Sequence, residues 1–171
     1  MRQVWHAQQV LVAYERQREA IVTMTRALFT LACVGALYGC SGPMGPVAGG
    51  KLEGEVAPWP EDWGLSDNVE NVLLETRPND PYSVTLWGVY RDRDFIVGAA
   101  ELDNRWAQNI LADPRVVLAI EGVLYEGRAE LVSATDENTA IADLFMRKYE
   151  IEDWEEFTGD REGAFFRISA R

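Results

Sequence analysis

The sequence predicts an α+β domain in which a small antiparallel β-barrel carries two helices. Short segments rich in β-branched and aromatic residues alternate with polar turns, which is typical of hairpin-linked strands. Two other segments have helical periodicity, and each stands between strands. The expected order is three strands, a helix, two strands, a helix and a last strand. This order favours a barrel with helical plugs.

The first three strands are expected between residues 72 and 100. Residues 72–76 form a short strand that ends at the Pro- and Asn-containing turn 77–81. Residues 83–90, SVTLWGVY, alternate between two faces. One face holds Val84, Leu86, Gly88 and Tyr90, and the other holds Ser83, Thr85, Trp87 and Val89. A polar turn at 91–94 leads to the return strand at 95–100.

The second half of the chain supplies both helices. Residues 102–112 are expected as a short helix that ends at Asp113-Pro114, because the residue before a proline avoids helical angles. Strands follow at 115–120, which is apolar on both faces, and at 123–133. Residues 136–149 give the strongest helical pattern. A charged, aromatic stretch at 150–157 precedes the final strand at 165–169.

The N-terminal region indicates a bacterial lipoprotein signal peptide. Residues 27–40, ALFTLACVGALYGC, form a short apolar run that follows Arg26 and ends at a cysteine. Residues 1–39 are therefore expected to be removed, and Cys40 to carry the lipid that anchors the protein to a membrane. The alternative is a buried core helix, because the run is too short to span a bilayer.

The residues around this run refine the expectation. Residues 1–23 are long for the start of a signal peptide and contain two glutamates, so Met24 is the expected translation start; a cytoplasmic amphipathic segment is the alternative. After the cysteine, residues 40–52 are rich in Gly and Pro and are expected as a flexible tether. The folded domain is then expected to occupy residues 53–171.

Composition excludes several classes of function for the part after the signal peptide. Residues 1–39 hold four arginines and two glutamates, so 12 basic and 26 acidic residues remain, a net charge of −14. This balance argues against binding to nucleic acid. The only histidine is His6 and the only cysteines are Cys33 and Cys40. His- or Cys-based catalysis and metal sites with nitrogen or sulfur ligands are therefore not expected.

One group of motifs carries a resemblance to a known family. The strand pairs frame Trp106-x-x-Asn109-Ile110 and Asp113-Pro114-Arg115-Val116. This arrangement resembles the flavin-reductase split β-barrel superfamily, which includes pyridoxamine-phosphate-oxidase-like proteins and deazaflavin-dependent nitroreductases. The resemblance covers about residues 69–149. It implies a six-stranded split barrel, a homodimer, and FMN or the deazaflavin F420 in a groove at the dimer interface.

The resemblance also implies candidate cofactor-binding residues. The strand with Thr85 and Trp87 usually borders the ring, and Ala100 lies at the strand end before the phosphate region. Trp106 replaces the basic residue of FMN-binding relatives and matches the nitroreductase-like pattern. The set of candidates is Arg77, Thr85, Trp87, Ala100, Arg105, Trp106 and Asn109.

Each candidate also has a structural interpretation. Trp87 either stacks on a ring or packs in a core, and Trp106 either contacts the cofactor or packs a helix onto the barrel. Asn109 either contacts the cofactor or braces the following turn. Arg105 and Arg77 are either phosphate ligands or solvated side chains. The acidic residues at 150–156 match no metal-binding loop, so no metal is expected.

Three functional hypotheses remain open at this point. The first is a lipid-anchored protein that faces the periplasm, with a flavin-dependent oxidoreductase activity on a small acceptor. Ser41 after the cysteine resembles the pattern that sorts lipoproteins to the outer membrane. The second is a cofactor-free binding or accessory module of an envelope complex. The third is a haem-handling barrel, for which only Tyr or Met could supply an axial ligand.

Overall fold

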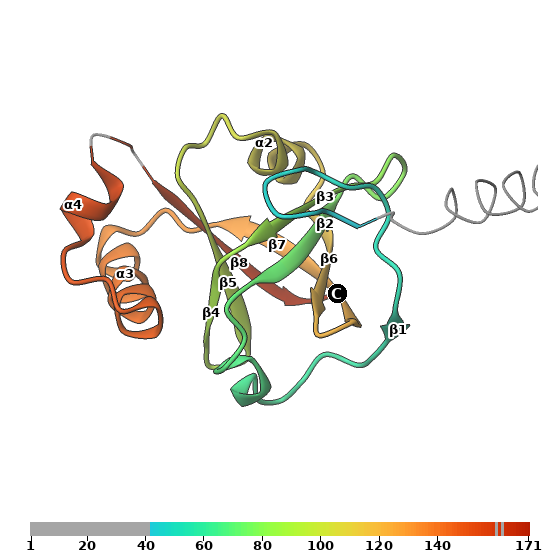
Figure 1. Cartoon of the computed structure of the whole chain (residues 1–171), viewed down its shortest axis with the longest axis horizontal. Helices are drawn as coiled ribbons and strands as arrows, with labels where there is room; N and C mark the ends of the chain where they lie inside the picture. The colour runs from blue at the N-terminus through green and yellow to red at the C-terminus, as the bar shows by residue number, and fades with distance from the viewer. Residues whose placement is uncertain (1–41, 160, 162) are drawn as a thin grey trace, which may run out of the picture. The chain divides into compact units, whose positions relative to one another are not determined.

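The computed structural model describes residues 42–159, 161 and 163–171. The chain divides into two compact units, residues 1–40 and residues 41–171. The predicted signal peptide and Cys40 lie outside the described residues. The elements of the second unit are β1 (Glu55–Val56), the 3₁₀ helix η2 (Gly64–Ser66), β2 (Val72–Thr76), β3 (Tyr82–Leu86), β4 (Gly88–Arg91), β5 (Asp94–Ala99), α2 (Arg105–Ala112), β6 (Arg115–Ile120), β7 (Val123–Leu131), α3 (Thr135–Tyr149), α4 (Trp154–Thr158) and β8 (Ala164–Ala170) (Figure 1).

The strands form a barrel that closes through a single residue. Their order is β3-β2-β6-β7-β8-β5-β4, and each of these neighbouring pairs is antiparallel. The first and last strands of this order, β3 and β4, are consecutive in the chain and are separated only by Trp87. The sheet therefore returns to its own start. Counted with β3 and β4 as the single strand predicted at residues 83–90, the barrel has six main strands, and the predicted α+β split barrel is confirmed. The two-residue β1 adds a parallel pair with β7.

Two local predictions need correction. The predicted strand 83–90 is broken at Trp87 into β3 and β4, because side chains of α3 take the place of a neighbouring strand at Gly88, as described below. The stretch 150–157, which was not expected as a helix, contains the short helix α4. The alternation of faces along residues 83–90 is confirmed. Val84, Leu86 and Tyr90 contact the barrel core, whereas Trp87 and Val89 contact a second cluster outside it.

The barrel interior is closed by a helical element at each end. Trp106 and Ile110 of α2 are buried in the core at one end. Trp63, which precedes η2 and is fully buried, packs edge-on against Phe95 and Tyr125. Figure 1 shows α2 above the barrel and the short helix η2 below it. The interior is therefore filled with side chains, and a ligand has to bind outside it.

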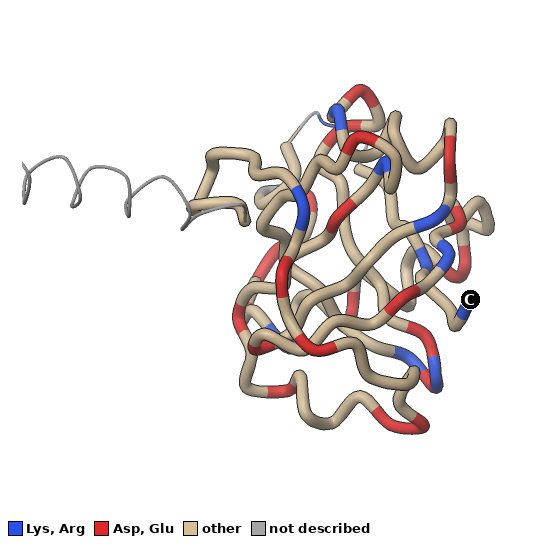
Figure 2. Tube along the Cα trace, turned by 90° about the vertical axis from the view of Figure 1, so that its right-hand side faces the viewer, with Lys and Arg blue, Asp and Glu red and all other residues tan. Residues whose placement is uncertain are grey.

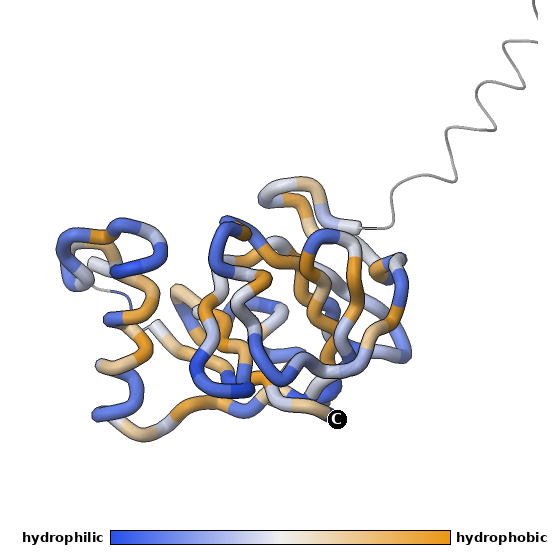
Figure 3. The backbone as a smooth tube through the Cα atoms, turned by 90° about the horizontal axis from the view of Figure 1, so that it is seen from below, coloured by the Kyte–Doolittle hydropathy of each residue, from blue (hydrophilic) through white to orange (hydrophobic). Residues whose placement is uncertain are grey.

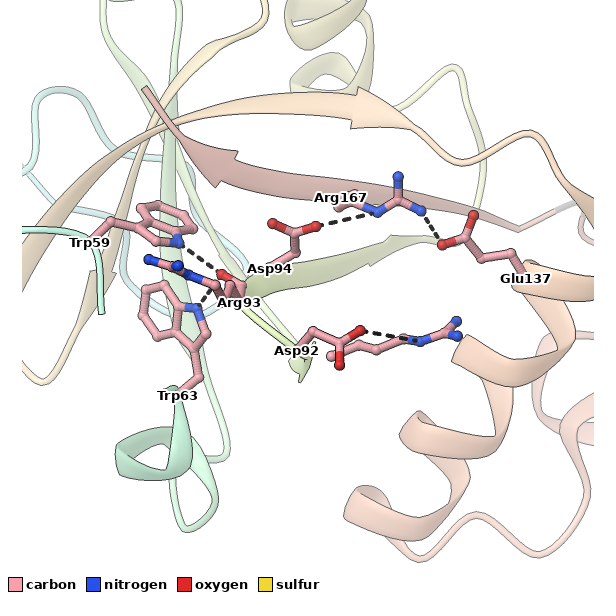
Figure 4. Close-up of polar contacts among 8 residues, drawn as sticks. Trp59, Trp63, Asp92, Arg93, Asp94, Glu137 and Arg167 are labelled. Atoms are coloured by element: carbon pink, nitrogen blue, oxygen red, sulfur yellow. Dashed lines mark hydrogen bonds and ion pairs between the residues drawn. The ribbon is translucent and has the colours of Figure 1, made fainter. Parts of the chain in front are cut away.

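The helices α3 and α4 stand beside the barrel (Figures 1 and 3). A second apolar cluster, which includes Ile141, Phe145 and Phe165, joins them to the outer faces of β4, β5 and β8. Arg167 of β8 also pairs with Glu137 of α3 and lies 3.7 Å from the carboxylate of Asp94 on β5 (Figure 4). The two helices are thus attached to the barrel along β4, β5 and β8. No helix among the described residues is long and apolar enough to cross a bilayer.

The segment expected as a tether contacts the barrel before residue 53. Gly49 and Ser83 exchange two backbone hydrogen bonds of 2.9 Å. Leu52 is 4% exposed, and its N–H donates to a carboxylate oxygen of Glu75 at 2.6 Å. The folded part therefore begins near Gly49, because the Leu52 side chain covers the apolar residues Ala119 and Leu124 on the outside of the barrel.

Candidate functional site

A groove of about 640 Å³ lies between the α3–α4 pair and the barrel. Its barrel side is formed by the end of β3 with Trp87, the end of β5 and the start of β8, and its other side by α3 and α4. Small residues occupy much of the barrel side: Gly98, Ala99, Ala100, Gly163 and Ala164. Because these residues have short side chains or none, the space beside Trp87 stays open.

The strand break at Trp87 positions one wall of the groove. The N–H of the next residue, Gly88, donates to the Tyr149 hydroxyl at 2.8 Å. The Gly88 carbonyl accepts from Lys148 Nζ at 2.8 Å and lies 3.0 Å from the same hydroxyl. Side chains from the end of α3 thus satisfy backbone groups that a neighbouring strand would otherwise pair. This substitution allows the chain to leave one ladder at Leu86 and enter another at Gly88.

Aromatic rings give the groove a flat apolar lining. The indole of Trp87 is parallel to the Tyr149 ring, with centroids 4.3 Å apart, and to the Phe157 ring at 5.6 Å. Farther along, Phe165 stacks on Phe145 at 5.4 Å and contacts Trp154 at 5.9 Å. Phe157 remains 43% exposed although it stacks on Trp87. Such parallel rings favour a planar ligand, since offset stacking adds to the free energy gained from burial.

The polar residues of the groove come mainly from the helices. Asn138 lines the groove, and its buried side-chain oxygen has no hydrogen-bond partner. Three charged residues line it as well: Asp143, Glu155 and Arg161. The Arg161 guanidinium donates to the carbonyls of Thr158 at 2.8 Å and Phe157 at 3.0 Å, so it caps the end of α4.

The environment at the end of α3 shifts two pKa values. Burial lowers the pKa of the Lys148 ammonium, and the negative charge of Asp67 partly opposes this effect. Burial raises the pKa of the Tyr149 phenol, although its hydrogen bond with Gly88 acts in the opposite direction. Both groups hold the chain at Gly88 and do not line the groove. Their shifts therefore reflect packing of α3 on β4.

The structure brings three of the predicted site residues together. Thr85, Trp87 and Ala100 all line the groove. Trp106 and Asn109 lie instead on α2. Trp106 is 6% exposed and packs edge-on against Phe166. Asn109 donates from Nδ2 to the Thr76 hydroxyl at 3.0 Å and so braces α2 against β2.

The two candidate phosphate ligands also lie outside the residues that line the groove. Arg77 adopts a positive φ of 57° in the turn after β2, donates to the Asp80 carbonyl at 3.0 Å and pairs with the Asp80 carboxylate. The Arg105 guanidinium lies over the Tyr82 ring, 4.7 Å from its centroid. Each arginine thus has a partner close to it.

Sequence reasoning missed the helical half of the groove. On α3 the lining residues recur at intervals of three and four, which places them on one helical face: Thr135, Asn138, Thr139, Ala142, Asp143 and Met146. This face of small and polar residues is visible in the sequence beside the apolar face used to predict the helix. No comparable signal marks Arg161, which follows α4 and gains its position from that helix.

The groove fits the ring of a flavin better than its phosphate. Flat aromatic walls and a floor of small residues suit a planar tricyclic ring. Arg161 is the single basic residue among the described lining residues, and two acidic side chains line the same groove. Among the described residues there is also no group of three or more His, Cys, Asp or Glu that could hold a metal ion.

Comparison with known proteins defines the class of fold. No family model matches the sequence, and no curated protein matches it either. A conserved hypothetical protein of Mycobacterium tuberculosis superposes with a TM-score of 0.54 and 18% identity over 71% of this chain and 86% of that one. HutZ, a haem storage protein of Vibrio cholerae, gives a TM-score of 0.50 and 14% identity over 61% and 83%. A putative pyridoxamine 5′-phosphate oxidase of Listeria innocua gives 0.46 and 10% over 58% and 82%.

At these identities the likeness concerns the fold alone. Together with the closed strand order, it shows that the described domain has a split β-barrel fold like that of the Mycobacterium tuberculosis protein and HutZ. On this barrel, the α3–α4 pair forms the aromatic groove described above.

Proposed function

We propose that the domain binds the ring of a flavin or deazaflavin, FMN or F420 being the forms implied by the resemblance, in the groove beside Trp87. The observation that supports this most directly is the combination of parallel aromatic rings and small barrel residues around one open space. When bound, such a ring supplies hydride or electron transfer to a small acceptor. The protein would then act as an oxidoreductase that needs no nucleophilic side chain.

The residues of the groove would bind and orient the ring. Trp87 and Phe157 offer stacking surfaces, and Phe165 and Trp154 exclude water from one side. Thr85 lies at the barrel wall, where its hydroxyl can hydrogen-bond to a polar edge of the ring. A homodimer, the arrangement implied by the resemblance, would bring a second copy near this site.

We also propose that the protein is a lipoprotein of the bacterial cell envelope. In this proposal Cys40 carries the lipid, and the barrel faces the periplasm close to the membrane, most simply the outer one. The proposal rests on the apolar run before Cys40 and on the acidic balance of the remaining chain, which favours solubility away from anionic lipid headgroups.

A cofactor-free binding or accessory module is the second candidate. It is favoured by the contacts of Trp87, whose ring already stacks on Tyr149 and Phe157. It is favoured as well by the distribution of arginines, since Arg77 is paired with Asp80 and Arg105 lies on Tyr82. In this alternative the groove would take a side chain or peptide of a partner protein.

Fluorescence titration of the purified full-length chain with riboflavin, FMN and F420 separates the candidates. Binding of any of them with quenched fluorescence and a stoichiometry of one ring per chain would support the first. The Trp87→Leu variant is expected to weaken binding by about tenfold, because one stacking surface is lost. Trp59→Leu, which changes a tryptophan that does not line the groove, is the matched control. No quenching in the tens of micromolar range would favour the cofactor-free module, and a new Soret band with added haem would favour the third hypothesis.

A further inference from the structure

We infer that the groove selects planar heteroaromatic ligands that carry no phosphate, either uncharged or cationic. This inference rests on the proposed function, in that it assumes a ring bound beside Trp87. It departs from the resemblance, which implies a phosphorylated cofactor. The evidence for this inference is the distribution of charged residues and aromatic rings around the groove.

The described residues on the barrel side of the groove offer no charge to a ligand. These residues, from Thr85 to Trp87, from Gly98 to Ala100 and from Gly163 to Phe165, are all uncharged. The helical side supplies the charged residues, and acids outnumber bases there. Asp143 of α3 and Glu155 of α4 are exposed at the groove, whereas Arg161 is the single cation among its described lining residues.

Arg161 is poorly suited to hold a phosphate. Two of its N–H groups donate to carbonyls at the end of α4. A phosphate dianion placed here would have to compete with these carbonyls, and the carboxylates of Asp143 and Glu155 line the same groove. Nearby like charges disfavour such a complex.

The other basic residues near the barrel do not offset the excess of acidic residues at the groove. Arg77 is paired with Asp80, and Arg105 lies over Tyr82; neither lines the groove. Lys148 donates hydrogen bonds to the carbonyls of Ser66 and Gly88, and it does not line the groove. Among the residues that the structure describes, the groove therefore has no cluster of basic side chains of the kind that binds phosphate bidentately.

The aromatic lining also favours uncharged or cationic ligands over ligands that carry a phosphate. The faces of Trp, Tyr and Phe rings are negative and attract cations. Trp87, Trp154 and Phe157 line the groove together with Asp143 and Glu155, so π faces and carboxylates meet around the same space. Figure 2 shows acidic residues spread along the described part of the chain with basic residues between them. With a net charge of −12 for the chain, the long-range field also repels anions.

Riboflavin and FMN test the inference, because they share the ring and differ in the phosphate. In titrations of the full-length chain at low ionic strength, riboflavin is expected to bind about threefold to tenfold more tightly than FMN. The difference is modest because Asp143 and Glu155 are exposed to solvent. It should shrink in high salt, where the repulsion of the phosphate is screened. A planar acridinium cation should compete with riboflavin for the same site.

Variants that neutralise the two acidic residues of the groove test whether these residues cause the preference for riboflavin over FMN. Asp143→Asn and Glu155→Gln together should bring the two dissociation constants to within about twofold of each other, mainly by tightening FMN. Glu152→Gln, which changes an acidic residue that does not line the groove, should leave the ratio unchanged. Tighter binding of FMN than of riboflavin, or a weakening of FMN binding by salt, would overturn the inference and leave the proposed function intact. Absence of binding by both flavins would overturn the proposed function and this inference with it.

Discussion

At the residue scale, Gly88 shows how side chains can replace a strand. Its N–H and carbonyl face away from β5, and α3 supplies their partners through Tyr149 and Lys148. The Tyr149 hydroxyl has one proton, so it accepts from Gly88 and donates to only one of the nearby carbonyls of Gly88 and Glu70 at a time. A neutral Lys148 amine would still have two N–H bonds for its two carbonyls.

Replacing Tyr149 with phenylalanine tests this arrangement. The variant keeps the ring that stacks on Trp87 but leaves the Gly88 N–H without an acceptor, so the free energy of unfolding should fall by about 1–2 kcal/mol at pH 7. Burial raises the Tyr149 pKa above 10.0 in the folded chain. The hydroxyl therefore contributes fully below pH 10.0 and loses its contribution as the pH rises through the folded pKa.

Urea unfolding of the wild type and the variant across alkaline pH measures both effects. The difference between the two proteins should be constant up to about pH 9 and should shrink above pH 10. Lys148 acts with the opposite sign, because its lowered pKa adds stability as the pH rises toward 10.5. A difference that does not depend on pH would contradict the assignment of this role to the Tyr149 hydroxyl.

At the element scale, the packing of β5 against β4 explains why residue 88 is a glycine. A Cβ atom at this position would lie 2.4 Å from Cε1 and 2.9 Å from Cζ of Phe95, whose side chain is fully buried. Phe95 also packs against Trp63 in the barrel core, so it cannot move without disturbing that contact. The close approach of β4 to β5 therefore requires the absence of a side chain.

Gly88→Ala is accordingly expected to lower the free energy of unfolding by about 2–3 kcal/mol, since overpacking forces the core to shift. Gly98→Ala is the matched control within β5, because its Cβ would meet Phe165 and Phe145 atoms at 3.5–3.6 Å, an ordinary contact distance. Urea denaturation of both variants measures the difference. Equal stability of the two would show that β4 can move away from Phe95 at little cost.

The elements that the sequence predicted are those governed by local signals. The helix that ends at Asp113-Pro114 and the strand Arg115–Ile120 follow from a proline and from an apolar run. The break at Trp87 could not be predicted in this way, because it depends on two side chains about 60 residues farther along the chain. Likewise α4 has five residues, too few to show a helical period on their own.

The candidate site was predictable to a similar extent. Thr85 and Trp87, which the resemblance implied as cofactor-binding residues, both line the groove, and the alternation along their strand places them on the same face. Arg77 and Arg105, the candidate phosphate ligands, do not line this groove. The sequence does not show that Arg77 pairs with Asp80, three residues later. The helical wall was missed because it forms only when α3 and α4 pack beside the barrel.

At the scale of the whole molecule, the closed barrel has an outer surface that must be covered. The α3–α4 pair covers one part of it, and the segment from Gly49 to Ala57 covers another. Ala119 and Leu124 lie beneath Leu52 in this second region. Trp59 and Trp63, farther along the chain, both donate from the indole N–H to the Arg93 carbonyl and fix the turn between β4 and β5 (Figure 4).

Truncated chains can test whether the folded domain begins near Gly49. A chain of residues 49–171 retains the Gly49–Ser83 hydrogen bonds and the buried Leu52, and it should be as stable as one of residues 42–171. A chain of residues 54–171 loses both. It leaves the Glu75 carboxylate, which is 6% exposed, without the Leu52 N–H that now donates to it at 2.6 Å. Thermal and urea unfolding should show a loss of about 2–4 kcal/mol for the shortest chain. Equal stability of all three chains would mean that residues 49–53 belong to a tether and that the domain begins at β1.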